Sequence, residues 1–255
     1  MSKGFFPQRP EAWPTIYAYS DNNPQYVGLL KIGYTTIDAE TRVAAQYPIK
    51  RPGQPPYKIV LEESAMRNDG SSFTDHEVHH YLKSKGVRNV GGEWFECAAR
   101  EVKAAIIALR RNELNEENRS LDFRMRPEQE KAVIKTAEYF INCKKENPGK
   151  TPHFLWNAKM RFGKTFTSYQ LAKKMRWSRL LVLTFKPAVQ NAWEEDLKTH
   201  IDFEGWQFIS RNGLTFEEVD KKKPFVCFGS FQDFLGKNEI GGIKAKNEWV
   251  HSINW

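Results

Sequence analysis

The sequence predicts a two-domain α/β protein, and three stretches of the chain indicate this division. Short segments with strand-like alternation are interleaved with amphipathic helical segments over residues 1–112. Residues 113–122 lose apolar periodicity and are predicted to form a linker. Residues 123–255 contain a glycine-bearing loop and continuous apolar runs of the kind found in strands buried on both faces. We therefore expect a small α+β domain with a three-stranded antiparallel sheet and flanking helices, followed by a parallel-sheet α/β domain.

The composition narrows the class of protein. The formal charge of +8 and the sequence pI near 9.3 favour a polyanionic partner, although lysine-rich solvated helices would give the same total. Cys97, Cys143 and Cys227 lie far apart, which argues against a disulfide framework or a zinc site and fits a reducing cytosol. No apolar run approaches membrane-spanning length, and the N-terminus lacks the long apolar region of a signal peptide. We therefore expect a cytoplasmic protein that makes no membrane contact.

Periodicity and turn residues predict the elements of the first domain. Strands are expected at residues 15–19, 26–35 and 58–62, with a further short strand after the turn that begins at Gly91. Helices are expected at residues 38–46, 73–85 and 98–111. Asp38 is a suitable N-cap for the first helix because its carboxylate can accept a backbone N–H of the first turn.

The helix predicted at residues 73–85 carries several polar side chains of interest. Phe73, Glu77 and Tyr81 are four residues apart, so we expect them to share one helix face. A buried Glu77 would need a cation or a metal ion, whereas the alternative is a solvent-exposed carboxylate of an ordinary helix. The three histidines, His76, His79 and His80, are expected on different faces and are interpreted mostly as polar surface, with His80 as a candidate helper.

Several of these residues, taken in order, resemble the GIY-YIG nuclease superfamily in its T5orf172 branch. The resemblance covers roughly residues 12–110 and rests on Thr15-Ile16-Tyr17, Lys31-Ile32-Gly33, Arg42, Glu77 and Gly92-Glu93-Trp94-Phe95. It implies metal-dependent hydrolysis of DNA. Tyr17 would activate or orient the attacking water, and Lys31 would favour its ionised form. Arg42 would stabilise the developing phosphorane charge, and Glu77 would hold Mg²⁺ or Mn²⁺.

The sequence departs from the superfamily pattern at one signature position. Lys31 stands where the second signature tyrosine is usual, although some restriction-enzyme relatives also have lysine there. Tyr34, three residues further on, is a candidate to support or replace Lys31. The identity of the general base therefore stays open.

A phosphate-binding loop is predicted at residues 158–165, whose sequence is Ala158-Lys159-Met160-Arg161-Phe162-Gly163-Lys164-Thr165. An apolar run at residues 153–156 is expected to form a strand before it, and a helix is expected at residues 166–175. Backbone N–H groups at the helix N-terminus would face the anion, Lys164 would reach the β- and γ-phosphates, and Thr165 would hold Mg²⁺. Ala158 replaces the usual first glycine. The alternative is a lysine-rich helix start that happens to contain Gly-Lys-Thr.

The remaining elements of this half alternate between strand and helix. A helix is expected from Pro127, well placed in a first turn, to about residue 145. Strands are expected at residues 179–185, 206–210 and 225–228, with a helix at residues 188–199. Such alternation predicts a parallel sheet with crossover connections.

This half resembles the first RecA-like domain of a superfamily 2 helicase of the type found in restriction motor subunits. The matching segments are Arg126-Pro127-Glu128-Gln129, residues 158–165, Leu183-Thr184-Phe185-Lys186-Pro187 and Gly229-Ser230-Phe231-Gln232. The resemblance implies that ATP is bound by residues that include Gln129 at the adenine, and Arg161, Gly163, Lys164 and Thr165. The family's Asp-Glu motif, second RecA-like domain and arginine finger do not follow before residue 255. We therefore expect a fragment of a longer protein that binds nucleotide without productive hydrolysis.

These features together predict the N-terminal portion of an NTP-dependent DNA endonuclease of a restriction or phage-defence system, acting on double-stranded DNA. One alternative is a helicase whose N-terminal module only binds DNA, and another is a stand-alone P-loop kinase-like enzyme. The joint presence of Tyr17, Lys31, Arg42 and Glu77 disfavours the binding module, and the glutamine motif disfavours the kinase. The expected partners include a second copy on the DNA and, from the resemblance, a methyltransferase or other restriction-system subunits.

Overall fold

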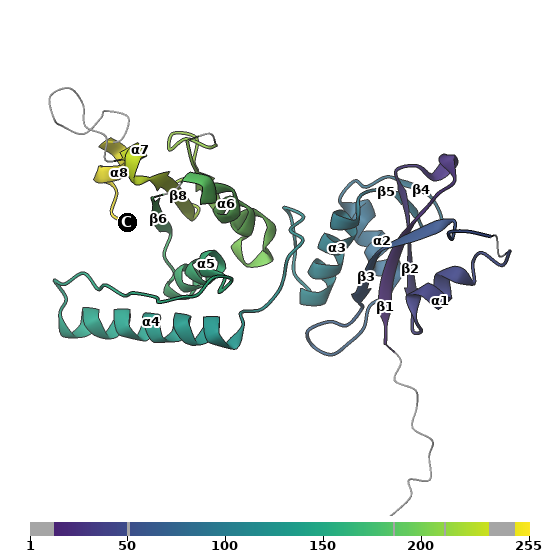
Figure 1. Cartoon of the computed structure of the whole chain (residues 1–255), viewed down its shortest axis with the longest axis horizontal. Helices are drawn as coiled ribbons and strands as arrows, with labels where there is room; N and C mark the ends of the chain where they lie inside the picture. The colour runs from purple at the N-terminus through teal and green to yellow at the C-terminus, as the bar shows by residue number, and fades with distance from the viewer. Residues whose placement is uncertain (1–12, 50–51, 186, 212, 235–247) are drawn as a thin grey trace, which may run out of the picture. The chain divides into compact units, whose positions relative to one another are not determined.

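The computed structural model describes residues 13–49, 52–185, 187–211, 213–234 and 248–255. The chain divides into two compact units, Met1–Leu121 and Asp122–Trp255 (Figure 1). The first contains an antiparallel sheet with helices, and the second a three-stranded parallel sheet with helices. The expectation of a mixed α/β protein is thus confirmed. None of the described helices combines the length and the apolar composition that a membrane span requires.

The sheet of the first unit has five strands in the order β3-β1-β2-β5-β4. Their bounds are β1 Thr15–Asp21, β2 Leu29–Thr35, β3 Tyr57–Ser64, β4 Asn89–Gly91 and β5 Trp94–Glu96. The predicted three-stranded sheet is therefore too small. The hairpin of β4 and β5 adds two strands because Gly91 and Gly92 adopt φ of 153° and 54° at its turn, values that favour glycine. A short 3-10 helix, Pro24–Tyr26, replaces the start of the predicted second strand.

The two faces of this sheet are covered by different helices. Ile16, Ala18, Leu30 and Ile32 belong to one core with residues of α2 (Asp75–Ser84) and α3 (Ala99–Arg111). The alternate residues of the same strands, among them Tyr17 and Tyr19, pack with Ala39 and Val43 of α1 (Ala39–Ala44). Successive strand residues point to opposite faces, so this alternation fixes which side chains meet α1.

Two predictions about helix starts can be compared with the structure. The Asp38 carboxylate accepts the Thr41 N–H at 2.8 Å, which confirms the predicted N-cap of α1. By contrast, α2 begins at Asp75, so Phe73 precedes the helix and cannot share a helix face with Glu77. The cause is a capping box in which the Glu77 carboxylate accepts the backbone N–H of Thr74, so that the helix starts at Asp75. The predicted Phe73–Glu77–Tyr81 stripe is therefore wrong.

The segment predicted as a linker is packed within the first unit. Asn115 is fully buried, and its side-chain amide donates to Ala104 O of α3 at 3.1 Å and to Arg119 O at 2.8 Å. The buried asparagine thus satisfies backbone carbonyl groups that would otherwise lack partners. This packing explains why the division of the chain falls at Leu121 rather than earlier.

The second unit consists of helices around a parallel sheet in the order β6-β8-β7. Its elements are α4 Pro127–Glu146, α5 Lys164–Met175, β6 Arg179–Thr184, α6 Gln190–Thr199, β7 Gln207–Ile209, β8 Phe225–Ser230, α7 Phe231–Phe234 and α8 Glu248–Ser252, with 3-10 turns at Pro187–Val189 and Ile201–Phe203. The parallel pairing and the position of Pro127 in the first turn of α4 are as predicted. Lys186, from one of the helicase-like segments, lies outside the described residues.

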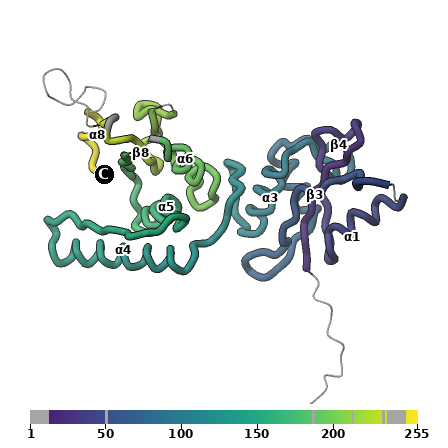
Figure 2. The backbone as a smooth tube through the Cα atoms, viewed as in Figure 1, coloured from purple at the N-terminus to yellow at the C-terminus, as the bar shows by residue number. Residues whose placement is uncertain are grey.

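The strand predicted before the phosphate loop is not formed. Residues 151–159 have no regular secondary structure, and the segment returns along α4 (Figure 2). The indole N–H of Trp156 donates to Thr136 Oγ1 of α4 at 2.7 Å, and the Phe154 ring lies 5.5 Å from that of Tyr139. These side chains bind the apolar run to the helix instead of the sheet. The described sheet therefore lacks the strand that the helicase resemblance places ahead of the loop.

Candidate functional site

A cluster of polar side chains around Gln46 lies on the α1 side of the first sheet. The Gln46 side-chain amide donates to the Tyr17 hydroxyl at 3.1 Å. Its carbonyl oxygen accepts from the Lys31 ammonium at 2.5 Å and from the Tyr19 hydroxyl at 2.8 Å. The structure thus brings Tyr17 and Lys31 together through one residue that the sequence analysis did not single out. No local signal marked Gln46, because its three partners are at least 15 residues away in the sequence.

Gly33 provides the space that the Tyr17 ring occupies. The two residues are directly opposite each other in β1 and β2. A Cβ atom at position 33 would lie 2.5 Å from Tyr17 Oη and 2.6 Å from Cζ, closer than real contacts permit. The absence of a side chain at position 33 therefore determines where the Tyr17 hydroxyl lies.

We expect Gly33→Ala to destabilise the first unit by about 1–3 kcal/mol, the usual cost of overpacking a core. The Tyr17 ring must move to relieve the contact, so its hydrogen bond with Gln46 is expected to break as well. Urea denaturation monitored by circular dichroism measures the first effect. A free energy of unfolding equal to that of the parent would show that the ring is not held against Gly33.

Burial affects the protonation of Tyr19, and an ion pair helps to fix the position of Lys31. Burial, the largest cause, raises the pKa of Tyr19 to about 12, so Tyr19 remains a hydrogen-bond donor at neutral pH. The Lys31 ammonium lies 3.3 Å from a carboxylate oxygen of Glu93 and 5.9 Å from the centre of the Tyr19 ring. Lys31 is therefore the cation that the structure joins to this cluster, and Gln46 and Glu93 hold it there.

Tyr34 lies on the opposite face of β2. It packs against the core that includes Leu30 and Ile32, whereas Lys31 and Gly33 face α1. Because side chains alternate along a strand, residues 31 and 34 point to different sides of the sheet. The expectation that Tyr34 supports or replaces Lys31 is therefore not met by the structure.

Arg42 belongs to the helix that covers the Tyr17 cluster. Its neighbour Val43 is buried against the cluster, and Arg42 itself is exposed. Within the described residues, the Arg42 side chain makes no ion pair or hydrogen bond. An exposed guanidinium on this helix has the donor geometry to bind a phosphate group bidentately.

Glu77 is bound to other residues of the unit rather than to the Tyr17 cluster. One carboxylate oxygen accepts from the Arg67 guanidinium, and the other accepts the Thr74 N–H at 3.0 Å. The side chain is 42% exposed, and each oxygen keeps a second lone pair. Mg²⁺ commonly uses one or two protein carboxylates and completes its shell with water and substrate oxygens. The donor chemistry of Glu77 therefore fits such an ion, with Arg67 as the competing cation.

The histidines of α2 share one hollow. A hollow of about 390 Å³ is lined by His76, His79, His80, Lys83, Gly92 and Glu93. His79 is nearly buried, and its Nε2 faces Ile32 O at 2.9 Å. His76 and His80, four residues apart, share one exposed face, whereas His79 is buried beneath them, so the prediction of different faces holds for His79 and fails for the other two. No group of three or more metal-ligating side chains is found in the described part of the chain.

In the second unit, the loop before α5 has the backbone shape of a helix start with a tight turn. Gly163, the N-cap of α5, has φ of 80°, and Arg161 has φ of 63°. The Lys164 ammonium lies 3.4 Å from Ala158 O and 3.2 Å from Lys159 O, so the lysine folds over the loop. Thr165 is half-buried in the first turn. The loop, the lysine and the helix N-terminus are thus adjacent, as a phosphate site requires.

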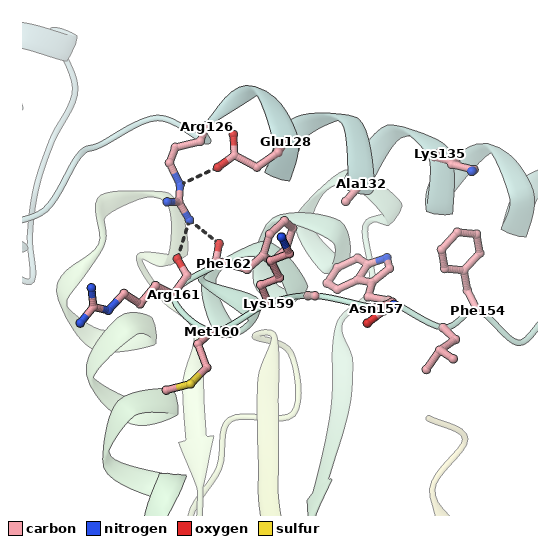
Figure 3. A pocket seen from close by; sticks show the side chains of 13 residues that line it. Arg126, Glu128, Ala132, Lys135, Phe154, Asn157, Lys159, Met160, Arg161 and Phe162 are labelled. Atoms are coloured by element: carbon pink, nitrogen blue, oxygen red, sulfur yellow. Dashed lines mark hydrogen bonds and ion pairs between the residues drawn. The ribbon is translucent and has the colours of Figure 1, made fainter.

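Gln129 and Arg126 hold this loop against the start of α4. Gln129 Nε2 donates to Phe162 O at 2.7 Å, and its Oε1 accepts the Arg126 N–H at 2.8 Å. The Arg126 guanidinium donates to Arg161 O at 2.9 Å and to Phe162 O at 2.5 Å (Figure 3). Gln129 is predicted to read adenine, but both the nitrogen and the oxygen of its side-chain amide are hydrogen-bonded to the protein.

A hollow of about 580 Å³ lies between α4 and the loop segment (Figure 3). It is within the size range of small-molecule sites. Its walls combine aromatic rings with cationic side chains, namely Phe154, Trp156, Phe162, Arg126, Lys135, Lys159 and Arg161. Rings that stack on a base and cations that attract phosphates are the two components that a nucleotide site needs.

Comparisons with known proteins concern the first unit most clearly. Residues 15–110 match the model of the T5orf172 domain. The chain is also 37% identical over 117 residues to a protein of Mycoplasma pneumoniae named "Putative type II restriction enzyme and methyltransferase" C-terminus. That alignment covers 45% of this chain and 16% of the relative, so the chain spans about a sixth of the relative's length. No solved structure matches the chain.

Proposed function

We propose that the first unit is a metal-dependent DNA endonuclease of a restriction or phage-defence system. The observation that carries the proposal is the set of hydrogen bonds by which Gln46 joins Tyr17 to Lys31. The T5orf172 match over residues 15–110 and the name of the Mycoplasma relative support it. By the same reasoning, double-stranded DNA is the substrate, and a second copy, a methyltransferase or another restriction-system subunit is the partner.

Each residue of the cluster has a defined chemical task in this proposal. In its ionised form, stabilised by the Gln46 N–H and the Lys31 ammonium, Tyr17 orients the attacking water and accepts its proton, which returns Tyr17 to the neutral hydroxyl. Arg42 contacts the phosphate from α1 and offsets the charge that develops there. Glu77 would hold Mg²⁺. When bound, this ion would supply Lewis-acid stabilisation of the leaving oxygen.

Strand nicking of a supercoiled plasmid by the chain, without nucleotide, tests the proposal. We expect open-circular product in Mg²⁺ or Mn²⁺ and none in EDTA. DNA that is shifted on a gel yet remains supercoiled in both metal ions would contradict the proposed endonuclease.

One observation favours the alternative of a non-catalytic DNA-binding module. The Glu77 carboxylate is paired with Arg67 and caps α2, which are structural tasks that require no metal. Under this alternative, the chain binds DNA and leaves it intact with every metal ion.

We also propose that the second unit binds ATP at the loop of residues 158–165, as part of a helicase-like motor. The adjacency of Lys164, the N-terminus of α5 and the aromatic hollow supports this proposal. Bound ATP would displace the Lys164 ammonium from the loop carbonyl groups toward its own phosphates.

Lys164→Ala is expected to weaken the binding of a fluorescent ATP analogue by about 10- to 100-fold, because hydrogen bonds to charged groups contribute about 1.5–3 kcal/mol. Lys174→Ala removes an exposed lysine from the last turn of the same helix and is the matched control. Fluorescence titration in Mg²⁺ measures both. Equal affinity in the two variants would remove the basis for a phosphate site at this loop.

A further inference from the structure

We propose that the hollow between α2 and the β4–β5 hairpin, which Glu93 connects to Lys31 of the Tyr17 cluster, binds a phosphate group of the DNA backbone. This inference rests on the proposed nuclease function and adds a substrate contact to it. The walls come from two elements, since His76, His80 and Lys83 lie on α2 and Gly92 and Glu93 on the hairpin. Neither the phosphate loop nor the Gln46 hydrogen bonds involve the three α2 side chains.

The three α2 side chains form a set of donors directed to one side. Their spacing of four and then three residues places them in a row on the helix surface. All three are exposed, and imidazole and ammonium groups donate N–H at neutral pH. His79 lies beneath them and is fixed by its contact with Ile32 O, so the floor of the hollow is rigid.

The charge of the hollow favours an anion over a metal cation. Among its lining residues, Glu93 is the one carboxylate, and it is paired with Lys31 at 3.3 Å. The described residues contain no group of three or more metal-ligating side chains. Lys83 therefore contributes a positive charge that no carboxylate of the hollow offsets, and a phosphate oxygen is the complementary group.

The position of Glu93 links the hollow to the proposed active site. Its carboxylate borders the hollow and also contacts Lys31, which is bound to Gln46. Duplex DNA carries one negative charge per about 1.7 Å of helix axis. A duplex with one phosphate at the Tyr17 cluster therefore presents further phosphates to nearby cations, and the α2 row is such a set.

The test is equilibrium binding of a fluorescent DNA duplex to the full chain in EDTA, measured by anisotropy between roughly 50 and 200 mM salt. The variants are Lys83→Gln and the double substitution His76→Gln with His80→Gln. Arg100→Gln, which removes an exposed cation from α3, is the matched control. Circular dichroism verifies that each variant is folded.

We expect Lys83→Gln to reduce the slope of log K against log salt by about 0.9, the value for one lost phosphate contact, and the double variant to bind more weakly than the parent. Arg100→Gln is expected to retain the parent slope.

Unchanged slopes and affinities in both hollow variants would overturn the inference. Because EDTA prevents metal-dependent cleavage, this outcome is distinguishable from failure of the nuclease. If the chain nicks plasmid but the hollow variants bind DNA as the parent does, only the proposed phosphate site is contradicted. If Lys83→Gln changes the slope but the chain never nicks plasmid, only the proposed endonuclease is contradicted.

Discussion

Tyr17→Phe is expected to reduce the rate of plasmid nicking by about 10²- to 10⁴-fold, the usual contribution of a positioned acid–base group. The substitution removes one hydroxyl and retains the buried ring, which is 2% exposed. The amide of Gln46 then has no oxygen to bind at this position, and the attacking water has no proton acceptor. Initial rates at saturating DNA, in Mg²⁺ and without nucleotide, measure the effect.

Tyr19→Phe is the control for this experiment. Tyr19 donates to the same Gln46 oxygen that Lys31 contacts, and its ring stacks on Tyr17 with centroids 6.4 Å apart. Since its pKa is raised to about 12, Tyr19 is not suited to accept a proton at neutral pH. We expect Tyr19→Phe to retain most of the activity. Equal losses in the two variants would indicate that the cluster is required for folding rather than for proton transfer.

Glu77→Gln is expected to reduce metal-dependent nicking by about 100-fold or more, because the variant loses the charge of the proposed metal ligand. Glutamine retains an oxygen that can accept the Thr74 N–H, so the capping box of α2 is preserved. A loss of activity without a comparable loss of stability therefore reports on the metal rather than on the helix. Nicking rates over a Mn²⁺ titration provide the measurement.

The chain contains a second capping-box glutamate that serves as the matched control. Glu101 accepts the Ala98 N–H at 2.8 Å at the start of α3, in the same structural position that Glu77 holds in α2. Glu101→Gln is expected to nick at the parent rate. If both variants nick as the parent does, Glu77 is only a helix cap and the metal site lies elsewhere.

Local rules predicted much of the fold. The Asp38 cap and Pro127 in the first turn of α4 are where the sequence places them, because both depend on neighbours within one helical turn. The arrangement of Tyr17 and Lys31 on one sheet face also follows from alternation once their strands pair.

Tertiary contacts caused two of the errors, and an unrecognised helix cap at Thr74 caused a third. The apolar run at residues 153–156 has the composition of a strand, yet Trp156 binds Thr136 and the run follows α4. Phe73 fits the helical spacing but lies before the cap and is buried in the core. Gln46 was not predicted because its three hydrogen-bond partners, which lie on β1 and β2, are each at least 15 residues away from it in the sequence. Contacts of that range leave no periodic signal.

The central claim is that the Tyr17–Gln46–Lys31 cluster of the first unit cleaves DNA. Its most direct test is a nicking assay on residues 1–121 alone, the first compact unit, with Mg²⁺ and without nucleotide. The account predicts open-circular plasmid from this unit and none from its Lys31→Met variant. A folded first unit that binds the plasmid and leaves it supercoiled, or a Lys31→Met variant that nicks as fast as its parent, would contradict the account.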